Sequence, residues 1–195
     1  MTKTKLANYI SDYLNPLIIS LILLAAVSLD TAADVREALG WFGLVVILNI
    51  LPVFLVAVLL VRSGRMDALF SNRRHQRHRM YVIGLFFTVI TMLCLEFLGA
   101  PLAIMAVLVS SLVTVVTFAA VNLWWKISVH TSTAAAMVVV LHILYGWWAA
   151  PAFLIIPVMG WARVHLAQHT VGQVLIGALA STGIVISVFY LYGII

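Results

Sequence analysis

Seven apolar runs, separated by short charged or Pro/Gly-containing breaks, account for nearly all of this 195-residue chain. The runs cover roughly residues 14–32, 38–61, 80–98, 102–123, 133–149, 152–162 and 172–195. A helix needs about 20 mostly apolar residues to cross a bilayer, so six runs are long enough and the 152–162 run is short. The pattern predicts an all-α, polytopic transmembrane helix bundle of six to seven spans.

The composition excludes a soluble globular domain. Hydrophobic residues make up 65% of the chain and charged residues 9%, whereas soluble domains have about 45–50% and about 25%. We therefore expect one integral membrane domain over residues 1–195, multi-pass, in a prokaryotic plasma membrane. Lys3 and Lys5 precede an apolar run without a clear small-residue cleavage site, which indicates a retained first helix. The single cysteine, Cys94, excludes a disulfide framework.

Three polar interruptions, at 62–79, 124–132 and 162–170, are separated from one another by an even number of apolar runs. If the 152–162 run is a crossing, each interruption follows an even-numbered crossing, so all three lie on one membrane face. Of the 11 Lys and Arg residues, all but Arg36 fall at the N-terminus or in these interruptions. The positive-inside rule would make this face cytoplasmic, but a ligand site would also gather cations, so the side stays open. The parity predicts that the interruptions converge on one site.

The second interruption, WWKISVHTS, places Lys126, Ser128 and His130 at the mouth of a helix that begins near Thr131 or Ser132. A helix N-terminus offers unpaired N–H groups and a positive dipole end, both of which favour an anion. The alternative is a helix cap with an incidental interfacial histidine.

The third interruption, ARVHLAQHTVGQ, contains Arg163, His169 and Gln173. On a helix, a spacing of four residues puts the Gln173 amide and the His169 ring on one face. The amide oxygen could then accept the Nδ1–H and leave Nε2 free to act. His165 and His169 are also four apart and could bind a metal. However, Asp67 is the single carboxylate of the three interruptions, so we expect an oxyanion ligand, with no metal and no cofactor.

The first interruption ends in a cationic cluster, RRHQRHR, over residues 73–79. It is interpreted either as an anchor for anionic headgroups or as part of the phosphate site. Arg74, Arg77 and Arg79 are its candidate ligands.

Together, these clusters resemble the motifs of the type 2 phosphatidic acid phosphatase superfamily of membrane lipid phosphatases. Ser128-Val129-His130 is similar to the Ser-Gly-His motif of that family, and Arg163, His169 and Gln173 keep the spacing of its S-R-x5-H-x3-D motif. The segment 74–81 resembles the R-x-x-R-x-x-P-Y form of one branch, which also carries K-I-S-x-H and a final Gln. The resemblance extends over about residues 72–177 and implies a phosphatase-like core at about 72–195.

The resemblance implies metal-independent hydrolysis of a lipid phosphomonoester or diphosphate, such as phosphatidic acid, phosphatidylglycerol phosphate or a prenyl diphosphate. It implies that His169 attacks phosphorus and forms a phosphohistidine, that Gln173 orients His169, and that His130 acts as acid and then base. The implied phosphate ligands are Arg163, Ser128, Arg74, Arg77, Lys126 and Arg79. The expected partners are the lipid phosphate and the bilayer, and no nucleic acid.

The chain departs from the family pattern at three points. Val129 replaces the motif glycine, Gln173 replaces the aspartate, and the lysine of the first motif is absent. An amide cannot stabilise an imidazolium as a carboxylate does, so the departures leave open a slow enzyme, a different geometry or binding without hydrolysis. The alternatives are a membrane protein that holds an anionic headgroup and, less favoured, a histidine-ligated metal oxidoreductase.

Overall fold

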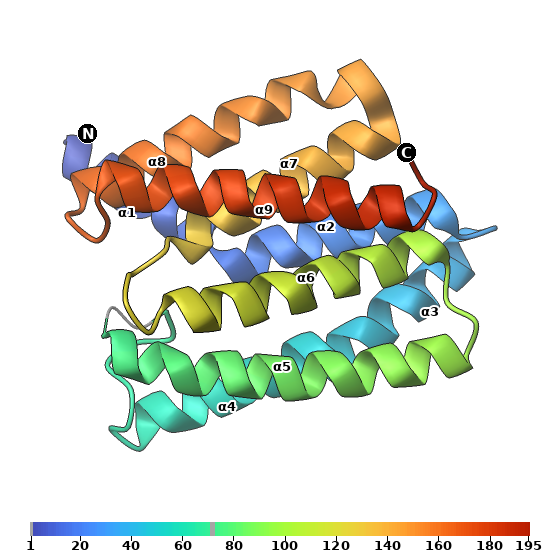
Figure 1. Ribbon diagram of the computed structural model, residues 1–195, viewed down its shortest axis with the longest axis horizontal. Coiled ribbons are helices and arrows are strands. Elements are labelled where there is room, and N and C mark those ends of the chain that lie inside the picture. Colours follow the sequence, from blue (N-terminus) through green and yellow to red (C-terminus); the bar gives the residue numbers. More distant parts are fainter. Residues whose placement is uncertain (1, 71–72) are drawn as a thin grey trace.

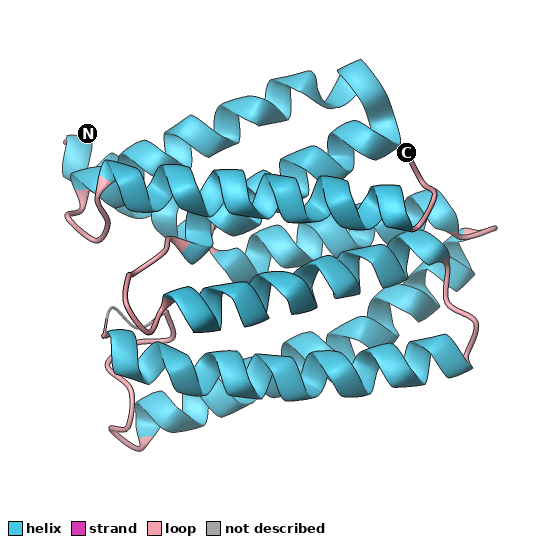
Figure 2. Ribbon diagram, viewed as in Figure 1, coloured by secondary structure: helices cyan, strands magenta, loops and turns pink. Residues whose placement is uncertain are grey.

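The computed structural model describes residues 2–70 and 73–195, leaving aside the side chains of residues 74 and 75. Within this part of the chain the regular structure is helical, without strands, and the helices pack as a bundle (Figures 1 and 2). In chain order the helices are α1 (Lys3–Tyr13), α2 (Pro16–Thr31), α3 (Val35–Val45), the π-helical η1 (Val46–Ile50), α4 (Leu51–Arg62), α5 (Arg74–Phe97), α6 (Leu102–Val121), α7 (Val129–Tyr145), the 3-10 helix η2 (Gly146–Leu154), α8 (Ile155–His165) and α9 (Val171–Leu191).

Short polar side chains determine where several of these helices begin. Asn15 caps α2 and Asp34 caps α3, each through its side-chain oxygen. Ser128 caps α7 and Thr170 caps α9 in the same way. Such caps satisfy backbone N–H groups that have no partner inside the helix. The two helices that carry the candidate histidine site therefore start at defined residues.

Five helical stretches are long and apolar enough to cross a membrane: Val35–Arg62, Gln76–Phe97, Leu102–Val121, Val129–His165 and Val171–Leu191. A sixth results if α1 and α2, which are bent by 47° at their junction, count as one span. The prediction of an all-helical chain with several apolar spans, compatible with an integral membrane protein, is confirmed. By length and composition, α7, η2 and α8 count as one candidate because they form one continuous helical stretch, and the number of six to seven spans stays a prediction.

Figure 1 shows that this long stretch turns back on itself at η2, so that α8 lies beside α7. The start of the chain, the residues after α4, and the loops 122–128 and 166–170 all lie at one end of the bundle (Figure 1). The structure thus brings the three polar interruptions to the same end, as their parity indicates.

Tryptophans mark both ends of α7. Trp147 and Trp148 of η2 are 84% and 92% exposed, and Trp124 at the opposite end is 76% exposed. Tryptophan is enriched at both membrane–water interfaces. The 17 residues of α7 span about 25 Å, close to the thickness of a hydrocarbon core.

The buried core lies between α2, α6, α7 and α9. Ile19, Ile104, Val138 and Phe189 are fully or almost fully buried there. By contrast, many large apolar side chains point outward, which suits a lipid surrounding rather than water.

The π-helical segment η1 lies just before Pro52. Proline lacks the N–H that an α-helix needs, and the N–H of Leu51 donates to the carbonyl of Val46, one residue further back than in an α-helix. From this segment the Asn49 amide donates to the Thr88 hydroxyl of α5 at 2.9 Å. This bond connects the span α3–η1–α4 with α5.

Candidate functional site

His169 lies in the tight turn between α8 and α9, held by the backbone. The N–H groups of Gln168 and His169 both donate to the carbonyl of Arg163, at 3.1 and 3.3 Å. Ala167 adopts a left-handed conformation with φ of 52°, which a non-glycine residue adopts rarely. The turn therefore fixes the spacing between Arg163 and His169.

Gln173 orients the His169 ring. Its Oε1 atom accepts the Thr170 N–H at 3.3 Å as part of a capping box and lies 3.0 Å from Nδ1 of His169. Because a backbone N–H can only donate, the amide atom that faces it is the oxygen. Because this oxygen accepts a hydrogen bond from Nδ1 of His169, the imidazole proton lies on Nδ1 and the lone pair of Nε2 is available. The predicted pairing of His169 with Gln173 is present.

Nε2 of His169 is buried and has no hydrogen-bond partner among the described residues. Burial lowers the pKa of His169 most, followed by the positive charges of Lys126 and Arg77, while the Gln173 hydrogen bond raises it and Arg163 lowers it further. Together they bring this pKa to about 3. The ring is therefore neutral at physiological pH, with an unprotonated Nε2 inside a cationic environment.

Arg163 is held from a distant part of the sequence. It lies in the last turn of α8, is 4% exposed, and donates through Nη1 to the Ser11 hydroxyl of α1 at 2.6 Å. Its Nε atom is buried without a partner in the described part of the chain. A buried guanidinium with an unused donor is suited to an oxyanion. Ser11, which is itself buried, carried no signal in the sequence.

His130 occupies the first turn of α7 and is 4% exposed. It interacts electrostatically with Arg163, His169 and Arg77, so the two histidines of the predicted site are neighbours. The ring of Phe70 packs edge-on against it, with the ring centroids 5.3 Å apart. The imidazole thus lies between a cationic cluster and an aromatic wall.

Arg77 is the buried cation of α5. Its Nη1 donates to the carbonyl of Ile127 at 3.1 Å, which ties the start of α5 to the loop before α7. Arg79 is exposed and does not line the cavity described below. The side chain of Arg74 falls outside the described residues. Of the three candidates on α5, the structure places Arg77 at the site.

Lys126 and Ser128 bind neighbouring backbone. The Lys126 ammonium donates to the carbonyl of Gln168 at 2.7 Å, so it connects the loops that precede α7 and α9. Burial lowers the pKa of Lys126, helped by the charges of Arg77 and Arg163, while Asp67 raises it. Ser128 is fully buried; its Oγ caps the N–H of Thr131 and its own N–H donates to the carbonyl of Gln173 at 3.3 Å.

A glycine of α9 permits the close approach of α7. A Cβ added at Gly177 would lie 2.7 Å from the Ser128 carbonyl oxygen and 3.1 Å from Oγ1 of Thr131. The Thr131 hydroxyl donates to the carbonyl of Val174 across the same contact at 3.1 Å. Gly177 was not predicted as a site residue, although a glycine inside a helix four residues after Gln173 is a signal of close packing.

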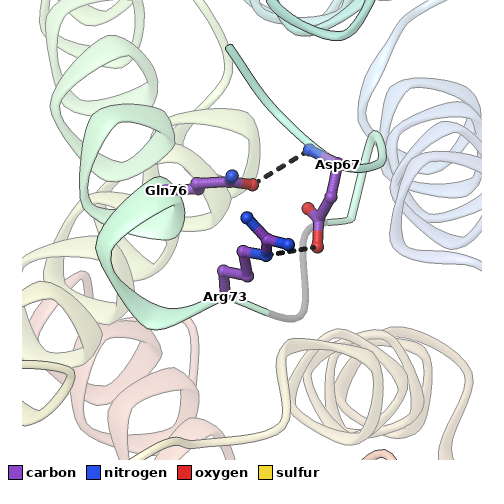
Figure 3. Close-up of polar contacts among 3 residues, drawn as sticks. All are labelled: Asp67, Arg73 and Gln76. Carbon is purple, nitrogen blue, oxygen red and sulfur yellow. Dashed lines mark hydrogen bonds and ion pairs between the residues drawn. The ribbon is translucent and has the colours of Figure 1, made fainter. Parts of the chain in front are cut away.

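A small polar network of Asp67, Arg73 and Gln76 connects the segment after α4 with the start of α5 (Figure 3). The backbone N–H of Asp67 donates to Oε1 of Gln76 at 3.0 Å, and its carboxylate lies 3.9 Å from Nε of Arg73. The carboxylate expected among the interruptions is thus engaged with an arginine.

His165 and His169, the pair that could bind a metal by their spacing, have different partners in the structure. His165 points its Nε2 toward the Thr4 hydroxyl at 3.3 Å and stacks on Trp161, so its contacts lie with α1 and α8. Among the described side chains, which do not include that of His75, there is no group of three or more His, Cys, Asp or Glu that could hold a metal. The environment of His169 is instead positively charged, which favours an anion with several oxygens.

A cavity of about 390 Å³ opens from this site into the bundle. Arg77 and His130 line it at the end that carries the site, together with Leu69 and Phe70. Lys126, Arg163 and His169 are not among its lining residues, so the cavity meets the site on the side of Arg77 and His130.

The arrangement combines an unprotonated imidazole nitrogen, a second histidine and two buried guanidiniums in one place. Comparisons of this chain with protein-family models, with curated proteins and with solved structures found no match.

Proposed function

We propose that the protein is a metal-independent membrane phosphatase that hydrolyses the phosphomonoester or diphosphate of a lipid through a phosphohistidine. One observation carries the proposal: Nε2 of His169 is buried, unpartnered within the described chain and unprotonated, because Gln173 holds the proton on Nδ1. The resemblance to the type 2 phosphatidic acid phosphatases agrees with it.

In the first step, His169 Nε2 attacks phosphorus; a P–N bond forms and the P–O bond to the lipid breaks. The leaving oxygen takes a proton from the imidazolium form of His130, and the group that departs is the lipid alcohol from a phosphomonoester or the lipid monophosphate from a diphosphate. In the second step, a water molecule attacks the phosphohistidine and gives its proton to His130 as the P–N bond breaks. Inorganic phosphate is released and the starting state returns.

The buried guanidiniums supply the charge that the transferring group requires. Arg163 has a free Nε donor, and Arg77 acts electrostatically on both histidines. Fixed positive groups in a site shielded from water stabilise developing negative charge without reorganisation. Lys126 acts mainly by holding the His169 loop through the Gln168 carbonyl.

The membrane arrangement follows from the same proposal. α8 counts as a crossing of its own, which gives seven spans and places the site at the interface where the three polar interruptions meet. A lipid headgroup would then meet His169 and His130 at that interface while its chains remain among the helices or in the bilayer.

A second candidate function is binding of an anionic lipid headgroup without turnover. Gln173 favours it, because an amide next to His169 cannot stabilise an imidazolium as a carboxylate would.

One experiment separates the two functions. Purified wild-type protein and the His169→Ala variant are given phosphatidic acid, phosphatidylglycerol phosphate and a prenyl diphosphate in the presence of EDTA. Phosphatase activity predicts phosphate release by the wild type that survives EDTA and falls at least 1,000-fold in the variant, on the order of the loss of a nucleophile. Quenching in base should leave a phosphorylated peptide that contains His169, detected by mass spectrometry.

The matched control is His78→Ala, which removes an exposed histidine near the start of α5. It should leave phosphate release unchanged. Retained lipid binding with no release from any lipid phosphate would refute hydrolysis and support headgroup binding instead.

A further inference from the structure

The cavity that opens from His130 and Arg77 extends far into the bundle. On α7 its lining runs from His130 to Val140, and on α5 from Arg77 to Thr88. Ten residues of helix rise about 15 Å. The cavity is thus an elongated space that starts at Arg77 and His130, on one side of the proposed phosphate site, and reaches the middle of the helices.

Most of the cavity wall is apolar. It is formed by side chains such as Leu23, Leu24, Val53, Ile104 and Val185. Several of the polar groups on the wall satisfy one another or the backbone.

The Asn49 amide donates to the Thr88 hydroxyl at 2.9 Å, and the Thr133 hydroxyl donates to the carbonyl of Val129 at 2.8 Å. A wall of this kind favours a hydrocarbon over a polar ligand.

We infer that this cavity is a chamber for one hydrocarbon chain of the substrate, so that the enzyme acts on single-chain lipid phosphates in preference to two-chain lipids. The inference rests on the proposed function, because the chain enters the chamber only when the phosphate lies at Arg77 and His130. It specifies the substrate class of that site.

The dimensions support a single chain. About 390 Å³ spread over about 15 Å gives a mean cross-section of about 26 Å², whereas one chain packed at contact distances of about 4.5 Å takes about 20 Å². Two chains side by side need about twice that area. An extended backbone advances about 1.2 Å per bond, so the chamber accepts about twelve carbons.

Gly84 offers a way to block the chamber without strain. It lines the cavity on α5, seven residues after Arg77, and a Cβ built there meets no atom within 4 Å. A cavity of about 150 Å³ holds a benzene ring, so a phenylalanine at this position fills more than a third of the chamber. Its ring would stand about 10 Å from the level of Arg77.

Gly183 provides the matched control. It lies in α9, is exposed, does not line the cavity, and also has no atom within 4 Å of an added Cβ. Gly183→Phe makes the same substitution in a helix while leaving the chamber open.

The experiment measures kcat/KM of wild type, Gly84→Phe and Gly183→Phe in nanodiscs for butyl phosphate, dodecyl phosphate and didodecanoyl phosphatidic acid. Binding of dodecylphosphonate, whose C–P bond is not hydrolysed, is measured in parallel. Wild type and Gly183→Phe should prefer dodecyl phosphate to the two-chain lipid at least tenfold. Gly84→Phe should lose about tenfold on dodecyl phosphate and on phosphonate binding, a typical effect of overfilling a packed site, and keep its activity on butyl phosphate.

Equal activity of Gly84→Phe and Gly183→Phe on dodecyl phosphate would overturn the inference, as would equal use of the two-chain lipid by the wild type. If the wild type hydrolyses none of the three esters and also releases no phosphate from the prenyl diphosphate, the proposed function fails. Phosphonate binding then tests separately whether the cavity holds a hydrocarbon chain. Weaker binding by Gly84→Phe alone would support the chamber, and equal binding by both variants would contradict it.

Discussion

Replacing Gly177 with alanine tests how closely the two site-bearing helices must approach. The new Cβ would lie 2.7 Å from the Ser128 carbonyl oxygen, so α7 and α9 must separate by about 0.7 Å to reach an ordinary contact of about 3.4 Å. The bonds that cross this contact are already long: Ser128 N–H to Gln173 at 3.3 Å and the Thr131 hydroxyl to Val174 at 3.1 Å. The separation would break the first and weaken the second.

The expected change in stability is small because two effects oppose each other. Overpacking costs about 1–3 kcal/mol, while alanine in place of glycine in a helix gains about 1 kcal/mol. The net loss of about 0–2 kcal/mol lowers Tm in detergent by up to about 8 °C, at about 2–4 °C per kcal/mol for a chain of this size. Activity should suffer more, because a misplacement of about 1 Å can cost 100-fold. We expect kcat for a lipid phosphate to fall about tenfold or more.

The assay compares Gly177→Ala with Gly183→Ala, whose added Cβ meets open space on the same helix. The control should keep kcat and gain up to about 1 kcal/mol in stability. A Gly177→Ala protein with wild-type kcat and an increased Tm would show that the helices separate freely and that the reasoning is wrong.

Three further perturbations test the electrostatics of the site. Gln173→Glu places a carboxylate next to Nδ1 of His169 and should raise the pKa of that ring above its value of about 3, as followed by NMR titration; an unchanged pKa would contradict the assigned contact. Because the folded-state pKa of His169 lies below the usual 6.5, the unfolded chain binds the extra proton between about pH 6.5 and 3. The stability that depends on this ring is therefore complete above pH 6.5 and decreases by up to about 1.4 kcal/mol per pH unit as the pH falls through that window. His169→Gln should flatten the dependence of Tm on pH, and equal slopes for both proteins would count against it. Ser11→Ala removes the acceptor of Arg163 Nη1 and should raise KM for lipid phosphates about tenfold, equivalent to about 1.4 kcal/mol, with recovery in Ser11→Thr; a change in kcat alone would argue against a positioning role.

The sequence predicts the local parts of the site well. The predicted contact between His169 and Gln173 is present, but His169 lies in the turn before α9, so the contact arises from the capping box rather than from a shared helix face. The gathering of the three interruptions at one end follows from the alternation of the apolar runs.

Contacts between distant segments could not be predicted in the same way. Ser11 and Arg163 are joined across the fold by a bond that no local pattern encodes. Arg77 and Arg79 are two residues apart on α5 and face different directions. Because both are arginines, the sequence does not show which of them is buried. The number of spans stays a prediction, because η2 joins α7 and α8 into one stretch although the chain turns back near Gly146, where φ is +58°.

The bond between Ser11 and Arg163 has a consequence for biogenesis. Ser11 leaves the ribosome early and must wait until α8 has been made before its arginine exists. The guanidinium therefore reaches its final place only after the intervening helices have entered the membrane. The bond can form only once the chain from α1 to α8 has been made, and a chain that stalls before α8 contains Ser11 without Arg163.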